Sequence, residues 1–330
     1  MLHKSLFRPL RILAWTALTM ACAHAPSIAA QEEWPSRPVR MVVPFPPGGT
    51  TDIAARLLAS RLGRQLGQTI SVQNIGGANG VLGMGEVARS DPDGYTLLYT
   101  TSSVYTSPVL DPTISLDPTK AFTPVVMTAV SPLVLLAHPR VPATDLPSAV
   151  DYLRRQQGQS AYASSGVGNI THLVFAQLLH SKALQALHVP YRGSAPAISN
   201  LASGEVQFLV NPISNAIPFI RANKIKAIAV LSAQRDELLP DVPTAAEAGM
   251  AELESGSWQG VLAPTGTPVA IVQKLNAEIL KALNTPELRE SFKVQGIQAI
   301  GTTPQAYGDF LRTEGERWAA LVKAGGVTLN

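Results

Sequence analysis

The residues with the clearest chemical potential form a glycine-containing loop, Phe45-Pro46-Pro47-Gly48-Gly49-Thr50-Thr51-Asp52. It joins a β-prone run to a helical pattern, so its glycines let a ligand approach the backbone and its threonines can begin a helix. Backbone N–H groups at a helix start, together with the helix dipole, bind anions. The loop lacks the Gly-Lys-Ser/Thr ending of a P-loop, and its adjacent glycines do not match a dinucleotide-binding loop. Two interpretations remain: an anion site, or a capped strand-to-helix turn.

Asp52 closes this loop and is expected in the first turn of the helix. A carboxylate there stabilises the positive end of the helix dipole by about 0.3–1 kcal/mol. The same carboxylate would repel a bound carboxylate, although it can contact an amine or a hydroxyl group of a ligand. Dipole stabilisation is the simpler interpretation, and Asp52 also stays a candidate ligand contact.

A second loop, from Tyr162 to Leu173, repeats this arrangement further along the chain. A β-prone run is followed by Gly166 and Gly168 among hydroxyl residues, and then by a helical pattern. Two such helix starts, one in each half of the chain, can face each other across a cleft and hold an anion with few formal charges. His172 begins an apolar helix face, where a lone histidine is more often structural than a ligand or a base.

Further polar residues follow other β-prone runs, which is where ligands bind in open α/β sheets. Thr100 to Ser103 follows one run, Tyr191 to Pro196 follows another, and Asn211 follows a third. Arg192 in the second of these loops can pair with a carboxylate or can be an exposed surface charge. Its position in the sequence does not decide between the two.

The elements that position these loops alternate between short β-branched runs and amphipathic helical patterns. This order predicts a mostly parallel sheet flanked by helices. A helix is expected over Thr50 to Leu66, with its leucines and Ile53 near one face, and Phe122 to Leu136 is a long β-prone run interrupted only by Ser131-Pro132. Two α/β units, roughly 34–131 and 132–232, precede helical patterns near 269–283, 286–295 and 304–323.

Residues 1–30 have the order of a secretory signal peptide, with basic residues first, an uncharged apolar stretch next and small residues last. The apolar stretch, Ile12 to Ala23, is too short to span a bilayer, which takes roughly 20 residues. We expect cleavage after Ala30, with Ala25 or Ala29 as alternatives.

Removal of this segment changes both the cysteine count and the charge. Cys22 is the only cysteine, so the mature chain cannot form a disulfide; Cys22 matches a lipid-attachment motif poorly, which leaves lipidation as the weaker alternative. The chain has 26 basic and 23 acidic residues, and the segment holds three of the basic ones, leaving 23 of each. With no basic stripe, the mature chain lacks the electrostatic pattern of a nucleic-acid-binding protein.

Short motifs over nearly the whole mature chain are shared with one family of proteins. They are WPSRPV (34–39), VPFPPGG (43–49), PDGYTLL (92–98), YASSG (162–166), HVPYRGSAPA (188–197), LPDVPT (239–244) and LAPTGTP (262–268). Together they resemble the Bug/TctC-type receptors, the periplasmic substrate-binding proteins of tripartite tricarboxylate transporters. The sequence departs from the family at Asn169 and Ile170, where small hydroxyl residues are usual, and at Asn211, where Asp is frequent.

The resemblance implies a type II periplasmic binding protein fold, an α/β fold whose two lobes enclose a ligand cleft. After the signal peptide predicted at 1–30, it implies a first domain from 31–131 plus 233–330 and a second domain at 132–232. The family grips a ligand carboxylate between the two glycine loops, largely through backbone N–H groups and ordered water. The candidate ligand-binding residues are therefore Phe45, Pro47, Gly48, Gly49, Thr50, Asp52, Thr101, Ser102, Ser164, Ser165, Gly166, Gly168, Asn169, Thr171 and Asn211.

The function that the resemblance implies is that of a receptor and not of an enzyme. We expect a monomer in the periplasm that uses no cofactor or metal, binds a small organic carboxylate and delivers it to inner-membrane permease subunits. A receptor that signals to a membrane partner would use the same cleft and stays an alternative. A hydrolase is less favoured, because neither Ser164 nor Ser165 lies in a G-x-S-x-G motif and no Asp is placed to orient His172. The acid itself is left open among di- and tricarboxylates, acidic amino acids and small aromatic acids.

Overall fold

The computed structural model describes residues 34–111 and 113–324, and the predicted signal peptide at 1–30 lies outside them. The chain divides into a short unit, residues 1–36, and a large unit from residue 37 onward, which contains every helix and strand below. The strands are β1 (Val39–Val43), β2 (Ile70–Asn74), β3 (Thr96–Thr100), β4 (Phe122–Ala137), β5 (Ala161–Ser164), β6 (Leu187–Pro190), β7 (Phe208–Pro212), β8 (Lys226–Val230), β9 (Gly256–Pro264) and β10 (Gln298–Ala299).

The helices follow the strands in the alternation that the sequence predicts. The α-helices are α2 (Thr50–Leu66), α3 (Val81–Ala88), α4 (Ser103–Leu110), α5 (Pro118–Ala121), α6 (Leu146–Gln156), α7 (Ile170–Ser181), α8 (Ser194–Ser203), α9 (Ile213–Arg221), α10 (Val269–Leu283), α11 (Pro286–Val294) and α12 (Pro304–Lys323). Two short 3₁₀ turns, η2 (Ala78–Gly80) and η3 (Ala251–Leu253), are also present.

The strands are ordered β2-β1-β3-β9-β4-β7-β5-β6, with β8 and β10 each paired to β4. The outer groups β2-β1-β3 and β6-β5-β7 are parallel, whereas β9 is antiparallel to both β3 and β4, and β4 is antiparallel to β7 and β8. The prediction of a mostly parallel sheet was therefore wrong for the centre. The reason is that β9 joins the sheet from far along the chain and runs opposite to its neighbours, with no βαβ crossover to fix its direction.

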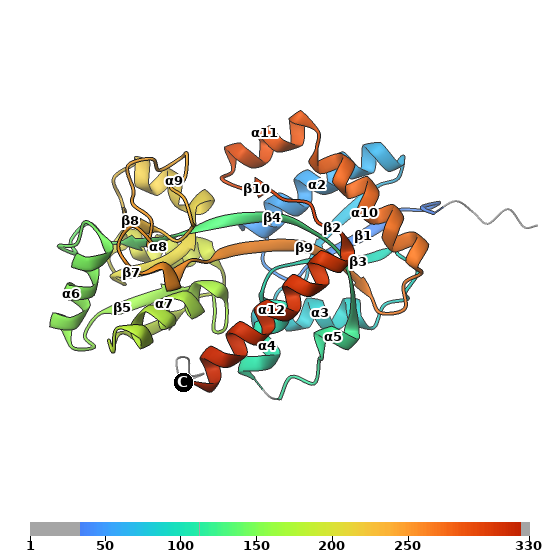
Figure 1. Cartoon of the computed structure of the whole chain (residues 1–330). Coiled ribbons are helices and arrows are strands. Elements are labelled where there is room, and N and C mark those ends of the chain that lie inside the picture. Colours follow the sequence, from blue (N-terminus) through green and yellow to red (C-terminus); the bar gives the residue numbers. More distant parts are fainter. Residues whose placement is uncertain (1–33, 112, 325–330) are drawn as a thin grey trace, which may run out of the picture. The chain divides into compact units, whose positions relative to one another are not determined.

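Strand β4 is shared by two groups of strands. Its first part, Phe122 to Pro132, pairs with β9, and its second part, Leu133 to Ala137, pairs with β7 and β8. We call the strands β2, β1, β3, β9 and the first part of β4, with their helices, the first lobe, and the remainder the second lobe. Figure 1 shows β4 as a long strand that passes from one lobe to the other. Pro132 lies where the partner changes, a position that suits a residue without a backbone N–H.

A second crossing lies close to the first. The N–H of Leu231 donates to the carbonyl of Leu133, and the N–H of Ser255 donates to the carbonyl of Leu231. Between them, Met250 and Leu253 pack in a core cluster with residues of α6 and α7. We therefore propose that the second lobe continues to about residue 255, so that the return to the first lobe falls at the start of β9 and not near residue 233.

Each lobe has helices on both sides of its strands. In Figure 1, α2, α10 and α11 lie on one side of the first lobe and α3, α4 and α12 on the other. In the second lobe, α6 and α7 contribute to one buried cluster and α8 and α9 to another. Helix α12 reaches both lobes, because its Tyr307 and Leu311 belong to a first-lobe cluster and its Trp318 to a second-lobe cluster.

Helix α2 carries the first glycine loop, and its boundaries match the prediction. Its buried face is formed by Ala54, Ala55, Leu58 and Leu62. The other predicted apolar residues, Ile53, Leu57 and Leu66, are only partly buried. The small alanines let the helix pack closely on the sheet, and the helix ends at Gly67, which has a left-handed φ of 67°.

Helix α3 packs so closely on the residues that directly follow β1 and β2 that one of its glycines cannot be enlarged. A Cβ atom on Gly83 would lie 2.6 Å from the carbonyl oxygen of Ile75 and 2.9 Å from the Cβ of Pro44. We therefore expect Gly83→Ala to lower the free energy of unfolding by roughly 1–3 kcal/mol, as overpacked cores do. Urea denaturation would measure it.

Gly85 in the same helix is the matched control. A Cβ atom there would meet only the guanidinium end of Arg89, at 3.2 Å, and that side chain can move. We expect Gly85→Ala to be neutral or to stabilise the helix by up to about 1 kcal/mol. Equal effects of the two variants would show that the close approach to Pro44 does not matter.

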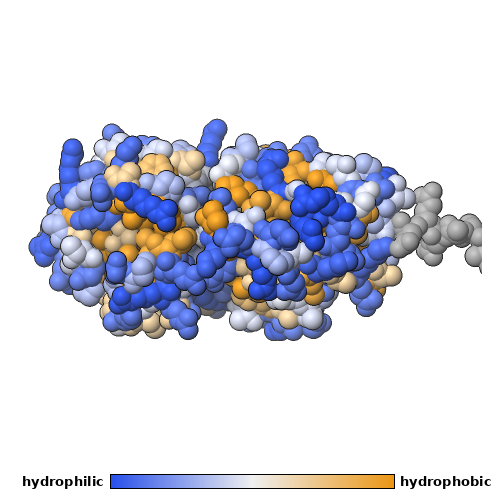
Figure 2. Space-filling model, turned by 90° about the horizontal axis from the view of Figure 1, so that it is seen from above, coloured by the Kyte–Doolittle hydropathy of each residue, from blue (hydrophilic) through white to orange (hydrophobic). Residues whose placement is uncertain are grey.

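The described surface is largely polar. Figure 2, which views the molecule from the side of α9 and α11, shows apolar residues reaching this face in patches between polar ones. Among residues 34–111 and 113–324, no helix has the length and apolar character needed to cross a bilayer. The same residues contain no cluster of three or more His, Cys, Asp or Glu side chains that could hold a metal ion.

Candidate ligand-binding cleft

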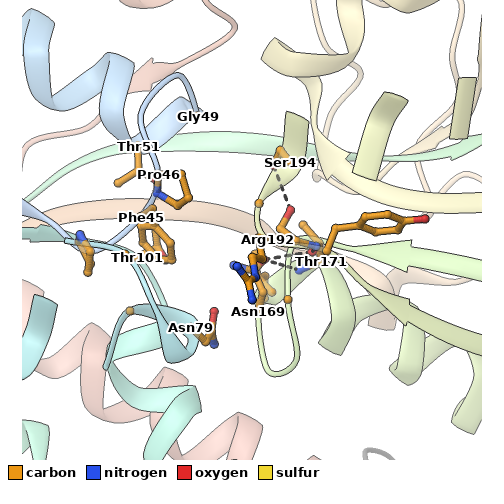
Figure 3. A pocket seen from close by; sticks show the side chains of 18 of the residues that line it. Phe45, Pro46, Gly49, Thr51, Asn79, Thr101, Asn169, Thr171, Arg192 and Ser194 are labelled. Atoms are coloured by element: carbon orange, nitrogen blue, oxygen red, sulfur yellow. Dashed lines mark hydrogen bonds between the residues drawn. The ribbon is translucent and has the colours of Figure 1, made fainter. Parts of the chain in front are cut away.

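A cavity of about 1100 Å³ lies between loops of the first lobe and loops of the second. Figure 3 shows Phe45, Gly49 and Thr101 on one side and Thr171 and Ser194 on the other. Ten of the predicted ligand-binding residues line this cavity, namely Phe45, Pro47, Gly49, Thr50, Asp52, Thr101, Ser165, Gly166, Asn169 and Thr171. Their contact with a ligand stays a prediction.

Five other predicted residues do not line the cavity: Gly48, Ser102, Ser164, Gly168 and Asn211. Gly48, Ser164 and Gly168 form hydrogen bonds that hold the two loops in place, as described below. Ser102 precedes α4 and is buried. Asn211 is completely buried on β7, and its amide has no hydrogen-bond partner among the described residues.

The start of α2 is open toward the cavity. Its N-cap residue is Gly49, and no side chain caps the helix, so the N–H groups of the first turn keep no side-chain partner. Thr50, Thr51 and Asp52 of this turn all line the cavity. A Cβ atom on Gly49 would meet nothing within 4 Å, so the cavity reaches the backbone itself. Unpaired N–H groups at the positive end of a seventeen-residue helix form an anion site.

The Asp52 carboxylate is occupied by the protein and organises this loop. It accepts hydrogen bonds from the N–H of Gly48 at 2.9 Å, the side-chain amide of Asn74 at 2.9 Å and the guanidinium of Arg56 at 3.1 Å. Burial raises the pKa of Asp52, but the hydrogen bonds from Arg56, Gly48 and Asn74 outweigh burial and hold its pKa below the ordinary value. Asp52 therefore stays ionised and its charge is balanced by Arg56. The N–H of Gly48 is used here and is not free for a ligand.

We expect Asp52→Asn to destabilise the protein by about 1–3 kcal/mol at pH 7, because it removes a charged acceptor from a buried network. The folded-state pKa of Asp52 is lowered, so the carboxylate contributes stability above its unfolded-state pKa near 3.8 and loses that contribution as the pH falls below it. The difference between wild type and variant should shrink between pH 5 and about pH 3. Guanidinium denaturation across that range measures it, and a constant difference would contradict this role.

The loop before α7 satisfies more of its own donors than the first loop does. The Asn169 side chain caps α7 by accepting from the N–H of Thr171, and the Thr171 hydroxyl accepts from the N–H of Ser165 at 2.9 Å. The N–H of Gly168 donates to a ring nitrogen of His172. The start of α7 is therefore a weaker anion site than the sequence predicts.

Helix α8 supplies the open helix start of the second lobe. Its N-cap residue is Gly193, no side chain caps it, and Ser194 and Ala195 line the cavity. The sequence signal was Gly193 followed by Pro196 in the first turn, a helix-start pattern. The loop was singled out from the sequence, but these residues were not predicted to bind the ligand.

The formal charges that line the cavity are of both signs. Among residues 34–111 and 113–324, Arg192 is the only Lys or Arg side chain that lines the cavity, and it forms no salt bridge with any of them. Asp111 also lines the cavity, and its carboxylate accepts hydrogen bonds from the N–H and hydroxyl of Thr113, which lower its pKa. Arg56 balances Asp52, which leaves Arg192 and Asp111 as opposite charges in the lining, and Arg192 is the cation with which an incoming carboxylate can pair.

Two hydrogen bonds join the lobes beside the cavity. The hydroxyl of Thr106 on α4 donates to the carbonyl of Gly168 at 2.8 Å, and the hydroxyls of Thr50 and Ser214 lie 2.9 Å apart. Gly168 has a φ of 75°, and a Cβ atom there would lie 2.4 Å from Leu110. The second-lobe loop is therefore fitted against α4 of the first lobe, and glycine is required at this contact.

Asn79 lines the cavity and was not among the predicted ligand-binding residues. It lies in η2 with a φ of 49°, and Figure 3 shows it facing the second-lobe loop. Its amide donates to the Ser107 hydroxyl at 3.0 Å, and its Oδ1 lies 4.0 Å from the position of a Cβ on Gly166. A non-glycine residue held at positive φ beside a cavity is a common feature of binding sites.

Two α/β lobes that share crossing strands and enclose a cavity with two open helix starts define a solute-binding protein. The chain belongs to the tripartite tricarboxylate transporter receptor family, TctC, whose model matches residues 54–327. Protein BugT of Bordetella pertussis is 35% identical to it over 97% of this chain and 98% of the relative.

Solved structures give the same result. The chain is similar to MatC from Rhodopseudomonas palustris with bound malate, at 34% identity and a TM-score of 0.82, covering 88% of this chain and all of the other. It is also similar to the R. palustris protein Rpa4515 with adipate, at 33% identity and a TM-score of 0.85, covering 90% and 99%. The periplasmic binding protein BugD is 34% identical, with a TM-score of 0.83, over 89% and 99%.

These findings confirm the predicted family, the two-lobed α/β binding-protein fold and the choice of a receptor over a hydrolase. The family and its structural relatives are periplasmic solute-binding proteins and not enzymes.

Proposed function

We propose that this protein binds a small organic carboxylate in the cleft and delivers it, in the periplasm, to inner-membrane permease subunits of a tripartite tricarboxylate-type transporter. The observation that carries the proposal is the uncapped start of α2, which points unpaired N–H groups into the cavity. The relatives named with malate and adipate hold carboxylates, which supports the same ligand class here. We further propose that the mature chain begins after Ala30 and acts as a monomer.

The ligand carboxylate would lie between the helix starts of α2 and α8, where the two dipoles act on the same negative charge. Gly49 allows the anion to reach the backbone, and Arg192 adds a formal charge at the second lobe. Thr101, Ser165 and Thr171 supply hydroxyl groups around it. Hydrogen bonds across the cleft, such as that from Thr106 to Gly168, would form as the lobes close on the ligand.

A binding screen with residues 31–330 tests the ligand class. Adipate, malate, citrate and glutamate would be compared by thermal shift at fixed pH and salt, with adipamide as the uncharged control. A ligand at a hundred times its Kd adds about 2.7 kcal/mol to the stability of the folded state. Stabilisation by acids and not by the amide would support a carboxylate receptor.

The same protein would be denatured and its released small molecules identified by mass spectrometry, because a ligand retained from expression can mask a shift. If no acid stabilises the protein and none is released, the carboxylate proposal is wrong.

Uptake of the identified acid by cells that express the receptor with its permease tests delivery. Normal uptake without the receptor, together with a ligand-dependent membrane partner of another kind, would favour signalling.

A further inference from the structure

Two histidines lie directly behind the second-lobe loop, outside the cavity lining. His172 on α7 and His188 on β6 stack face to face, with ring centroids 3.9 Å apart and planes 1° from parallel. Tyr162 of β5 stacks on His188 at 4.9 Å, and Phe175 of α7 stacks on Tyr162 at 4.1 Å. The imidazoles therefore end a column of rings that begins in the core of the lobe.

Each imidazole holds a different part of the loop from Ser164 to Gly168. The N–H of Gly168 donates to Nδ1 of His172 at 3.1 Å, and the hydroxyl of Ser164 lies 2.7 Å from Nε2 of His188. The Ser164 hydroxyl also lies 3.2 Å from the N–H and 3.1 Å from the carbonyl of Gly166. His188 thus holds Ser164 at the start of the loop, and His172 holds Gly168 at its end. Gly166 in the middle is held through the Ser164 hydroxyl.

The contact between Gly168 and His172 requires a neutral His172 ring. Nδ1 of His172 accepts a hydrogen bond, so the proton of this ring is on Nε2, and a second proton on Nδ1 would face the N–H of Gly168. Burial lowers the pKa of His172 to about 3, with a smaller effect from His188, and burial lowers the pKa of His188 to about 4. Among the residues that the structure describes, the only other titratable group stacked on the pair is the Tyr162 phenol. At neutral pH both rings are uncharged.

We propose that the stacked His172–His188 pair is a positioning device that sets the geometry of the loop from Ser164 to Gly168, and with it the affinity of the cleft for its anion. The proposal rests on the function proposed above. Ser165 and Gly166 line the cavity, while Ser164 and Gly168 anchor them from outside it. Both anchors end on side chains that are linked by ring stacking to the lobe core, so a shift of either ring moves residues that face the ligand.

Paired substitutions test this device. His172→Asn keeps an acceptor close to the position of Nδ1, whereas His172→Leu keeps only bulk; His188→Gln and His188→Leu make the same comparison at Nε2. With adipate as the probe in calorimetry, we expect each leucine variant to lose about tenfold in affinity and each amide variant to recover most of it. Leucine variants with wild-type affinity, or amide variants as weak as the leucine ones, would overturn the proposal.

Two measurements on the ligand-free protein do not depend on the proposed function or on the leucine variants folding. Nitrogen NMR of the wild type should show His172 with its proton on Nε2, and hydrogen exchange at the Gly168 amide should be slow in wild type and His172→Asn. A proton on Nδ1, or a Gly168 amide that exchanges as fast as an exposed one, would refute the anchoring. If adipate fails to bind the wild type while both measurements agree with the proposal, the ligand class is at fault and not the positioning device.

Discussion

Replacing Gly49 with valine should weaken ligand binding by at least about a hundredfold, which is about 2.7 kcal/mol. A Cβ on Gly49 meets no protein atom within 4 Å, so the valine side chain would extend into the cavity over the unpaired N–H groups of α2. Hydrogen bonds to a charged group contribute about 1.5–3 kcal/mol each, and the valine would block two or more of them. Calorimetric titration with the acid found in the screen would measure the loss.

The fold should tolerate this change. Gly49 has φ −81° and ψ 165°, an extended conformation that valine adopts readily, and replacing glycine at an N-cap costs about 1 kcal/mol or less. Gly49→Ala should give an intermediate affinity, and Ala251→Val, an exposed site outside the cavity, should bind normally. Undiminished binding by Gly49→Val would remove the start of α2 from the site.

Thr106→Val should lower affinity by roughly tenfold or more, because it deletes the hydroxyl that donates to Gly168 across the cleft. Thr106 is buried, so the carbonyl of Gly168 would be left without its partner when the lobes are together. An unsatisfied buried acceptor costs about 1–3 kcal/mol, and this cost falls on the ligand-bound state if closure forms the bond. Titration of the variant gives the affinity.

The conservative variant Thr106→Ser keeps the hydroxyl and should bind almost as the wild type does. Unfolding of the ligand-free protein shows in which state the bond acts, because a bond already present without ligand would lower the stability of the ligand-free protein and leave the affinity unchanged. A Thr106→Val protein with wild-type affinity would mean that the bond to Gly168 does not contribute to the bound state.

The sequence predicted most elements of the fold because local patterns and tertiary burial agree there. The helix from Thr50 to Leu66 begins after a glycine pair and ends before Gly67, and its predicted limits are the observed ones. The long β-prone run from Phe122 extends through Pro132 because the strand changes partners at that proline. The limits of the helix are signals within the segment itself, whereas the continuity of the strand depends on its partners.

Other features depend on contacts that no local pattern reveals. Helix α4, Ser103 to Leu110, contains Pro108 and β-branched residues, and it is helical because it is buried against α12 and the second-lobe loop. The direction of β9 depends on β3 and β4, which are distant in sequence. The sequence identified both glycine loops, but it did not predict which of their backbone N–H groups are free to bind a ligand. The N–H of Gly48 donates to Asp52 and that of Gly168 donates to His172, and neither contact follows from a local pattern.

The discontinuous first lobe also has a consequence for how the nascent chain matures. Strands β1 to β3 are made early, but their neighbour β9 and the helices α10 and α12 that complete the lobe are encoded more than 150 residues after Thr100. At about 5–20 residues per second, the ribosome leaves that interval open for on the order of 10–30 s. The second lobe, whose strands and helices from α6 to β8 are contiguous, can form on its own during that time. The half-site at α2 thus stays unfinished until β9 and α10 have been made, so the first lobe can be completed only after the second.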